Sequence, residues 1–382
     1  MLSEEIKNKF TSTFNKNPLV VRSPGRINMI GEHTDYNEGY VMPAAIDKQI
    51  VCAISANYNH KCKIIAYDLD DSFEFDITNF KKSDKGWPNY ILGVIEQFQK
   101  RGMEIRGFDC VFGGDIPLGA GLSSSAAMEC AFAFSFNLLY EHNLPKLEIV
   151  KLSQAAENEF VGVKCGIMDQ FASVHGKVDQ IFRLDCKTLE FEYFNFVLDE
   201  YRLVLCDTQV KHSLASSEYN TRRNECEEGV AILQKRYKNI HSLRDVTIEV
   251  LTKHESEINP VTFKRCKYIV EENARVIDCC DLLQKGDLIG FGENMFQTHE
   301  GLSNDYEVSC KELDFLAAKA KESNMVIGAR MMGGGFGGCT INIVKIERLD
   351  QFINYMTDAY KNELNRELKT YVVKIENGTS KL

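Results

Sequence analysis

The chain has 382 residues, 44% of them hydrophobic, so we expect two domains or one large domain with substantial cores. The net charge is −10, and Lys and Arg form no basic stripe, which argues against nucleic-acid and membrane partners. The first ten residues have no apolar core of signal-peptide length, and the 13 cysteines include no Cys-x-x-Cys pair. We therefore expect a cytoplasmic protein with reduced thiols.

The predicted secondary structure alternates irregularly between strands and helices. In chain order we predict strands at 50–56 and 61–67, a helix at 87–98, a strand at 108–112, helices at 126–140 and 147–160, strands at 181–184 and 201–206, helices at 219–237 and through most of 262–323, a strand at 340–344, a helix at 349–364 and a last strand at 370–375. This order fits an α+β fold with two lobes, residues 1–196 and 197–382. A cleft between two lobes is a usual ligand site.

The first polar motif lies between residues 22 and 39, where glycines mark bends of the backbone. Arg26, Glu32, His33 and Asp35 lie close together in this segment. Carboxylates accept hydrogen bonds from sugar hydroxyls, and a histidine donates or accepts, so the group suits a polyhydroxyl ligand. A solvated polar loop is an equally good interpretation of these residues alone, and a metal site is a weaker one.

The second motif, residues 114–127, follows the predicted strand 108–112 and runs into a helix. Gly119 and Gly121 allow close backbone approach, and Ser123 begins a run of serines at the helix start. Free N–H groups and the positive end of a helix form a cradle for phosphate. No Gly-Lys-Ser or Gly-Lys-Thr occurs, so this is not a Walker loop. The alternative is a loop with a serine N-cap.

Two further segments carry candidate functional residues. Asp169 lies among apolar neighbours in the segment 164–171, where it is either a general base, a helix N-cap or a buried ion-pair partner. Residues 330–340 contain Gly333, Gly335 and Gly338 in the Gly-x-Gly-x-x-Gly spacing. A strand rather than a helix is predicted to follow, so we expect a loop that approaches a ligand or another loop, not a dinucleotide site.

Together these segments resemble the GHMP kinases, a family of small-molecule kinases. The order is the same: a substrate motif, a phosphate loop of the form Pro-x-x-x-Gly-Leu-Ser-Ser-Ser-Ala, and a glycine-rich motif near the end. Within the family, residues 25–36, 165–170 and 213–219 are similar to the galactokinases. The resemblance implies an N-terminal lobe like ribosomal protein S5 domain 2 and a ferredoxin-like C-terminal lobe. It also implies transfer of the ATP γ-phosphoryl group to the C1 hydroxyl of α-D-galactose, giving galactose 1-phosphate and ADP.

The resemblance also assigns roles to residues of this chain. Asp169 matches the catalytic base and Arg26 the catalytic arginine that offsets charge. The positions that match sugar contacts are Arg26, Glu32, His33, Asp35, Gly166, Asp169 and Tyr219. The positions that match ATP contacts are Gly119, Ala120, Gly121, Leu122, Ser123, Ser124 and Ser125, with Trp87 at the adenine. Ser125 and Glu157 match the ligands of Mg²⁺, which favours few protein ligands beside phosphate oxygens.

Two alternatives stay open from the sequence. One is a sugar 1-kinase of the same fold that acts on N-acetylgalactosamine or arabinose. The other is a non-catalytic galactose sensor, a relative that lacks a Ser-Ala pair in the phosphate loop; here residues 123–127 are complete. Met29, Met42 and Ala127 depart from residues frequent in the family, yet none removes a polar group that the mechanism needs. We expect a monomer whose ligands are galactose and MgATP.

Overall fold

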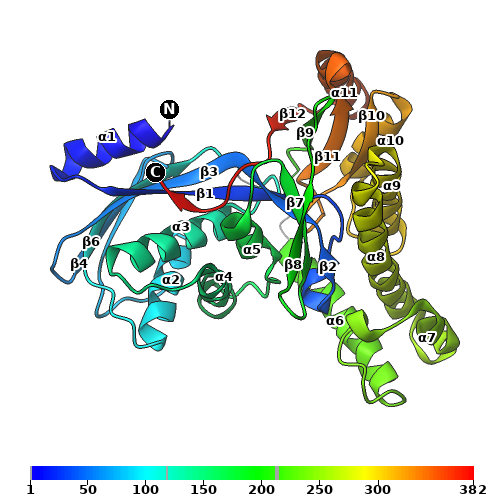
Figure 1. The fold of residues 1–382 in the computed structure, drawn as a ribbon, viewed down its shortest axis with the longest axis horizontal. Coiled ribbons are helices and arrows are strands. Elements are labelled where there is room, and N and C mark those ends of the chain that lie inside the picture. The colour runs from blue at the N-terminus through cyan, green and yellow to red at the C-terminus, as the bar shows by residue number, and fades with distance from the viewer. Residues whose placement is uncertain (1, 118, 211–214) are drawn as a thin grey trace.

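The computed structural model describes residues 2–117, 119–210 and 215–382 (Figure 1). The helices are α1 (Leu2–Phe14), α2 (Pro88–Lys100), α3 (Ser124–Leu139), α4 (Lys146–Ala155), α5 (Met168–His175), α6 (Ala215–Gln234), α7 (Ile248–Lys253), α8 (Pro260–Gln284), α9 (Leu288–Asn304), α10 (Lys311–Glu322) and α11 (Leu349–Leu364). The strands are β1 (Leu19–Asn28), β2 (Tyr40–Val41), β3 (Pro43–Ala56), β4 (Lys61–Ala66), β5 (Asp71–Asp76), β6 (Phe108–Gly114), β7 (Gln180–Asp185), β8 (Phe191–Asn195), β9 (Tyr201–Asp207), β10 (Val326–Met331), β11 (Cys339–Lys345), β12 (Lys369–Val373) and β13 (Ser380–Lys381). Among the described residues, no helix combines the length and apolarity needed to cross a membrane.

The largest sheet has six strands in the order β13-β1-β3-β6-β4-β5, with helices on both faces (Figure 1). Successive side chains of a strand point to opposite faces, and β3 shows this directly. Val51 and Ala53 pack with Phe10 of α1 on one face, whereas Cys52 and Ile54 join the main core on the other. Helix α3 covers that second face, where it contacts β1 and β3. The sheet therefore holds the start of α3, and with it the phosphate motif, in place.

The remaining strands form a three-stranded sheet, β2-β7-β8, and a four-stranded sheet, β10-β11-β9-β12. The central strand β9 is buried on both faces. Its Leu203 and Leu205 face the main core, while Val204 and Cys206 pack with Phe352 of α11. The sheet positions β10 and β11, which flank the glycine-rich motif.

The structure changes three of the predicted elements and adds others that were not predicted, among them α1, β1, β5, β8 and β10. Strand β3 begins at Pro43 rather than at 50, and the helix predicted at 147–160 is α-helical only to Ala155 and continues as a π-helix, η2 (Ala156–Val161). Residues 370–375 are not the last strand, because β13 follows and pairs with β1. A two-residue polar strand has no apolar alternation to reveal it. Strands β1 to β8 precede residue 196 and β9 to β12 follow it, whereas β13 returns to the sheet that contains β1. We retain the lobe boundary at residue 196 as a proposal.

Candidate active site

The first polar motif begins in β1, and its part from residue 29 to residue 39 forms a loop that closes on itself between β1 and β2. The Thr34 hydroxyl donates to the carbonyl oxygens of Gly31, at 2.9 Å, and of Tyr40, at 2.5 Å. Gly31 has φ +90°, and a Cβ added there would lie 2.5 Å from the Tyr40 carbonyl oxygen, so only glycine fits. This tight closure turns residues 32–35 toward one side of the loop.

That side faces a cavity of about 430 Å³. The cavity brings together the first polar motif, the segment around Asp169, the start of α6 and the glycine-rich motif. Its lining is Arg26, Glu32, His33, Asp35, Glu157, Gly162, Val163, Cys165, Met168, Asp169, Tyr219, Asn220, Gly333, Gly334 and Gly335. A solvated polar loop is therefore the wrong interpretation of residues 32–35.

Asp169 lies in this cavity with both carboxylate oxygens engaged. Arg26 Nε donates to Oδ1 at 2.8 Å, and the Ser123 hydroxyl donates to Oδ2 at 2.5 Å. The N-cap of α5 is Ile167, so the cap interpretation of Asp169 is wrong. Asp169 does pair with Arg26, although its side chain is only partly buried, and its role as a general base stays a prediction. Burial lowers the pKa of Arg26, but the Asp169 carboxylate and its acidic neighbours raise it more, so Arg26 stays cationic.

Arg26 also holds the phosphate loop. It follows an irregularity of β1 between Pro24 and Arg26, where the strand register shifts. Its Nη1 donates to the Gly121 carbonyl oxygen at 2.6 Å, and its backbone N–H donates to the Leu122 carbonyl oxygen at 3.2 Å. The same arginine thus fixes the candidate base and the loop that would hold phosphate.

The phosphate loop has the backbone of a close-approach turn. Gly119 and Gly121 have φ +79° and +75°, and Ser123 has φ +58°, a conformation rare for residues with a side chain. Ser123 lies at the N-cap of α3 without a side-chain cap bond, because its hydroxyl binds Asp169 instead. A serine thus stands at the N-cap, as the alternative predicts, but its hydroxyl bonds to Asp169 and does not cap the helix. Leu118 of this motif lies outside the described residues.

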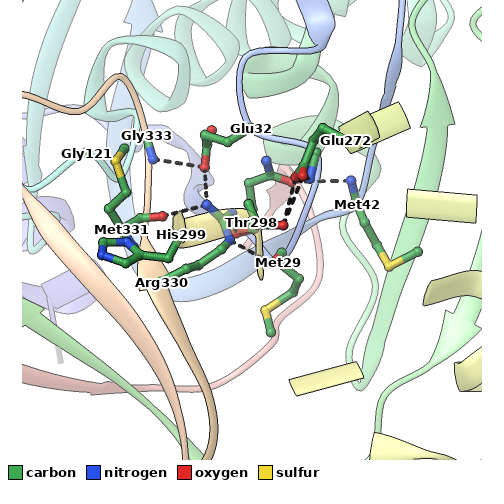
Figure 2. A network of polar contacts seen from close by, with 12 residues as sticks. Met29, Glu32, Met42, Gly121, Glu272, Thr298, His299, Arg330, Met331 and Gly333 are labelled. Atoms are coloured by element: carbon green, nitrogen blue, oxygen red, sulfur yellow. Dashed lines mark hydrogen bonds and ion pairs between the residues drawn. The ribbon is translucent and has the colours of Figure 1, made fainter. Parts of the chain in front are cut away.

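Glu32 is held by a buried arginine to which the sequence pattern assigned no role (Figure 2). Arg330 Nη1 donates to Glu32 Oε2 at 2.9 Å, and the Gly333 backbone N–H donates to the same oxygen at 3.0 Å. Arg330 Nε donates to the Met29 carbonyl oxygen. Burial raises the pKa of Glu32, but Arg330 and then Arg26 lower it further, so the carboxylate is ionised.

His33 and Tyr219 form an aromatic wall of the cavity. Their ring centroids are 5.5 Å apart, and His33 Nδ1 lies 2.9 Å from the Tyr36 hydroxyl oxygen. Burial lowers the pKa of His33 to about 4, which leaves a neutral ring near pH 7. The described residues contain no group of three or more His, Cys, Asp and Glu placed to hold a metal. Ser213 and Leu214, near Tyr219 in the galactokinase-like segment, lie outside the described residues.

Asp35 and Gly166 are matched in shape. A Cβ added to Gly166 would lie 1.9 Å from Asp35 Oδ2, so the glycine makes room for the carboxylate. Burial, followed by the charge of Asp169, raises the pKa of Asp35 to about 7. A carboxyl that burial makes costly to ionise gains from the hydroxyl donors of a ligand.

The glycine-rich motif packs against the phosphate loop, with two of its glycines facing the backbone of Ala120 and Gly121. A Cβ added to Gly333 would lie 3.4 Å from the Gly121 Cα, and one added to Gly338 would lie 3.6 Å from Ala120. Strand β11 follows, so the loop-approach interpretation is confirmed and the dinucleotide interpretation is excluded.

Glu157, on η2, borders the same cavity and contacts buried polar neighbours. The Gln170 side-chain amide donates to Glu157 Oε2 at 2.7 Å and to Glu129 Oε2 at 3.1 Å. Burial and then the charge of Asp169 raise the pKa of Glu157, and a bond from the Ser125 hydroxyl lowers it. A serine hydroxyl beside a carboxylate, close to a second carboxylate, fits the oxygen donors and charge that Mg²⁺ requires.

Trp87 lies apart from these residues. Its indole N–H donates to Asp71 at 3.0 Å, and its ring packs against Phe73 and Phe112. It does not line the cavity that contains Asp169. An adenine contact by Trp87 stays a prediction.

The comparisons with known proteins agree with this geometry. The model of the GHMP kinase N-terminal domain matches residues 89–177, the galactokinase galactose-binding signature matches 8–56, and the GHMP kinase C-terminal model matches 281–362. A galactokinase of Clostridium acetobutylicum is 42% identical over 389 aligned positions, covering 100% of this chain and 98% of the relative. A galactokinase of Roseiflexus is 37% identical and covers 99% of this chain and 97% of the relative. The chain belongs to the galactokinases.

Structures of this family extend the agreement to the fold. The crystal structure of Lactococcus lactis galactokinase complexed with galactose superposes with a TM-score of 0.95, at 36% identity and 98% coverage of each chain. The mevalonate kinase of Methanococcus jannaschii, at 18% identity and a TM-score of 0.66 over 94% of this chain and 99% of that one, shares the fold alone. The expected two-lobed GHMP kinase fold is confirmed.

Proposed function

We propose that this galactokinase-family chain transfers the γ-phosphoryl group of ATP to the C1 hydroxyl of α-D-galactose, giving galactose 1-phosphate and ADP. One observation carries the proposal. Asp169 is held by Arg26 and Ser123 at the point where the galactose-signature loop, the phosphate loop and the glycine-rich loop meet. A base at the junction of a sugar site and a phosphate site is what a sugar kinase requires.

The sugar side of the site has three hydrogen-bonding groups with different properties. Glu32 is ionised, and Arg330 already holds it in position, so it accepts hydrogen bonds from sugar hydroxyls without rearrangement. His33 is neutral and buried. Asp35 gains hydrogen bonds from sugar hydroxyls in a site where its charge is otherwise poorly solvated. Substrate choice follows because a sugar that lacks one of these hydroxyls leaves a buried polar group unpaired.

Asp169 accepts the proton of the C1 hydroxyl as that oxygen attacks the γ-phosphorus. A new bond forms between the C1 oxygen and the γ-phosphorus. The bond from the γ-phosphorus to the β,γ-bridging oxygen breaks, and its electron pair leaves with ADP. Arg26 orients Asp169 and offsets negative charge on the transferred group. Ser123 fixes the second carboxylate oxygen, so the base presents a single geometry to the sugar.

Ser125 and Glu157 are the residues that would hold Mg²⁺, and the ion would neutralise phosphate charge and align the phosphate oxygens. The backbone of the phosphate loop and the N-terminus of α3 bind the triphosphate beside it. Glu157→Gln should raise the Mg²⁺ concentration needed for half-maximal rate by about tenfold. Its nucleotide-free fold, checked by circular dichroism, should match the wild type, and an unchanged Mg²⁺ requirement would count against this ligand.

The competing functions have less support. The sensor alternative needs a defective phosphate loop, whereas Ser123 here bonds directly to the candidate base. The Clostridium and Roseiflexus relatives carry the name galactokinase, and the Lactococcus enzyme was crystallised with galactose. This favours galactose over N-acetylgalactosamine or arabinose.

The proposal is tested by a coupled ADP-release assay with MgATP and a panel of galactose, N-acetylgalactosamine, arabinose, glucose, mevalonate and homoserine. We expect turnover with galactose far above the others. Turnover led by another sugar would contradict the substrate assignment, and galactose binding without turnover would support a sensor. We also propose a monomer, which light scattering after gel filtration would check, and a cytoplasmic location stays a prediction.

A further inference from the structure

The loop that carries the sugar-binding residues is held at both ends by one helix from the far half of the chain. We propose that Glu272 and Asn273, consecutive residues of α8, are positioning residues that set the affinity for the sugar. This inference rests on the proposed function, because it concerns the same sugar site. Neither residue lines the cavity, so each would act through the loop.

Glu272 holds the start of the loop. Its Oε1 accepts the backbone N–H of Gly31 at 2.8 Å, one residue before Glu32. The carboxylate is fully buried, and the Thr298 hydroxyl donates to it (Figure 2). Arg275 also donates to this carboxylate. A buried carboxylate with this many donors is rigid, so it fixes the loop entry in one position.

Asn273 holds the end of the loop. Its Oδ1 accepts the backbone N–H of Tyr40 at 2.9 Å. A Cβ added to Gly39 would lie 2.3 Å from this Oδ1, so glycine at 39 is what allows the approach. The two clamped N–H groups, of Gly31 and Tyr40, bracket the whole segment that carries Glu32, His33 and Asp35.

The loop needs such an external hold because it concentrates buried charge. Burial and then the charge of Asp169 make Asp35 costly to ionise, and Glu32 adds a third carboxylate nearby. Internal bonds such as those of Thr34 close the loop but do not fix it relative to Asp169. A site loosened by about an ångström loses binding and rate, so fixing the loop ends should be visible in sugar affinity.

The Asn273 side chain offers a clean test. Its Nδ2 is buried and has no hydrogen-bond partner in the described part of the chain, so replacing that amide nitrogen by oxygen removes no bond. Asn273→Leu removes the acceptor for Tyr40, whereas Asn273→Asp keeps it. Glu271→Gln is the matched control, because Glu271 lies on the same helix and pairs with exposed Lys267.

The experiment is calorimetric titration with galactose in the absence of ATP, combined with KM for ATP and thermal unfolding. We expect Asn273→Leu to raise the galactose Kd about tenfold, in line with the loss of one buried hydrogen bond, with KM for ATP changed less than about twofold. Asn273→Asp should restore the Kd to within about threefold of wild type. Glu272→Leu removes the acceptor for the Gly31 N–H, so it provides the same test at the other end of the loop if Asn273→Leu does not fold.

Either of two results would overturn the inference: an unchanged galactose Kd in Asn273→Leu and Glu272→Leu, or equal weakening of galactose and ATP. If Asn273 had a purely structural role, Asn273→Leu would lower the unfolding temperature without changing the galactose Kd, and Asn273→Asp would have no galactose affinity to restore. Failure of the proposed function has a different signature, since the wild type itself would then bind no galactose or turn over no ATP.

Discussion

Two arginine–carboxylate ion pairs lie at the cavity. Their nitrogen–oxygen distances are nearly the same, but their surroundings differ. Arg26 and Asp169 are 2.8 Å apart, and the Asp169 side chain is 25% exposed. Arg330 and Glu32 are 2.9 Å apart, and their side chains are 0% and 3% exposed. The distance alone therefore does not distinguish a catalytic pair from a supporting one. Access of the carboxylate to the cavity, together with its other hydrogen bonds, makes the distinction.

The other partners of the two arginines explain this difference. Arg26 connects Asp169 to the phosphate loop through Gly121, so its contacts lie where charge moves in the reaction. Arg330 bonds to the Met29 and Asn28 carbonyl oxygens, so it anchors the end of β1 and the start of the sugar loop. We infer that the first pair serves chemistry and the second holds the sugar site in shape.

The largest expected effect is that of Asp169→Asn on rate. The change removes the base but keeps the size and an acceptor for Arg26, so kcat should fall by about 100-fold or more. The galactose Kd, measured by calorimetry, should stay within about threefold of wild type. Activity near wild type would show that Asp169 is not the base.

Arg330→Met should act on stability instead. It leaves Glu32 buried without its cation, which we expect to lower the free energy of unfolding by about 3–5 kcal/mol, measured by urea denaturation. Asp169→Asn is the matched comparison and should change that free energy by less than about 1.5 kcal/mol. Equal losses of unfolding free energy in the two variants would contradict the assignment of one ion pair to catalysis and the other to stability.

Gly166→Ala sharpens the comparison inside the sugar site. The added methyl group would meet the Asp35 carboxylate at 1.9 Å and must displace it. We expect galactose affinity to fall about 30-fold, with KM for ATP nearly unchanged, because overpacking costs about 1–3 kcal/mol. Gly162→Ala is a control on the same cavity wall, since a Cβ there meets nothing within 4 Å, although its φ of +98° adds backbone strain. A galactose affinity in Gly166→Ala equal to wild type would contradict the fitted shape.

The smallest expected effect is the pH dependence that Asp35 gives to stability. The pKa of Asp35 is raised from 3.8 to about 7, chiefly by burial, so its contribution is fully favourable below pH 3.8 and is lost as pH rises through 7. Asp35→Asn does not titrate, so the variant should gain stability over wild type at pH 8 and little at pH 4. Denaturation curves at both pH values measure this, and a pH-independent difference would refute it.

The sequence was most informative where the chemistry is contiguous. Each of the three motifs carries its polar or glycine residues within a few positions, so local patterns singled out Glu32, Asp169 and the phosphate loop as candidates, and the resemblance to the GHMP kinases then implied their roles. The functions of Arg330 and Glu272 could not, because their partners lie 298 and 241 residues away. Pairing over such distances leaves no local pattern, and the same reason explains why the short strand β13 was not predicted.

The central claim is that galactose binds in this cavity with its C1 hydroxyl at Asp169. A crystal structure with galactose and a non-hydrolysable ATP analogue tests it most directly. The account predicts the anomeric oxygen within about 3.2 Å of an Asp169 carboxylate oxygen, between that residue and the γ-phosphate. A sugar bound elsewhere, or bound with another hydroxyl at Asp169, would contradict it.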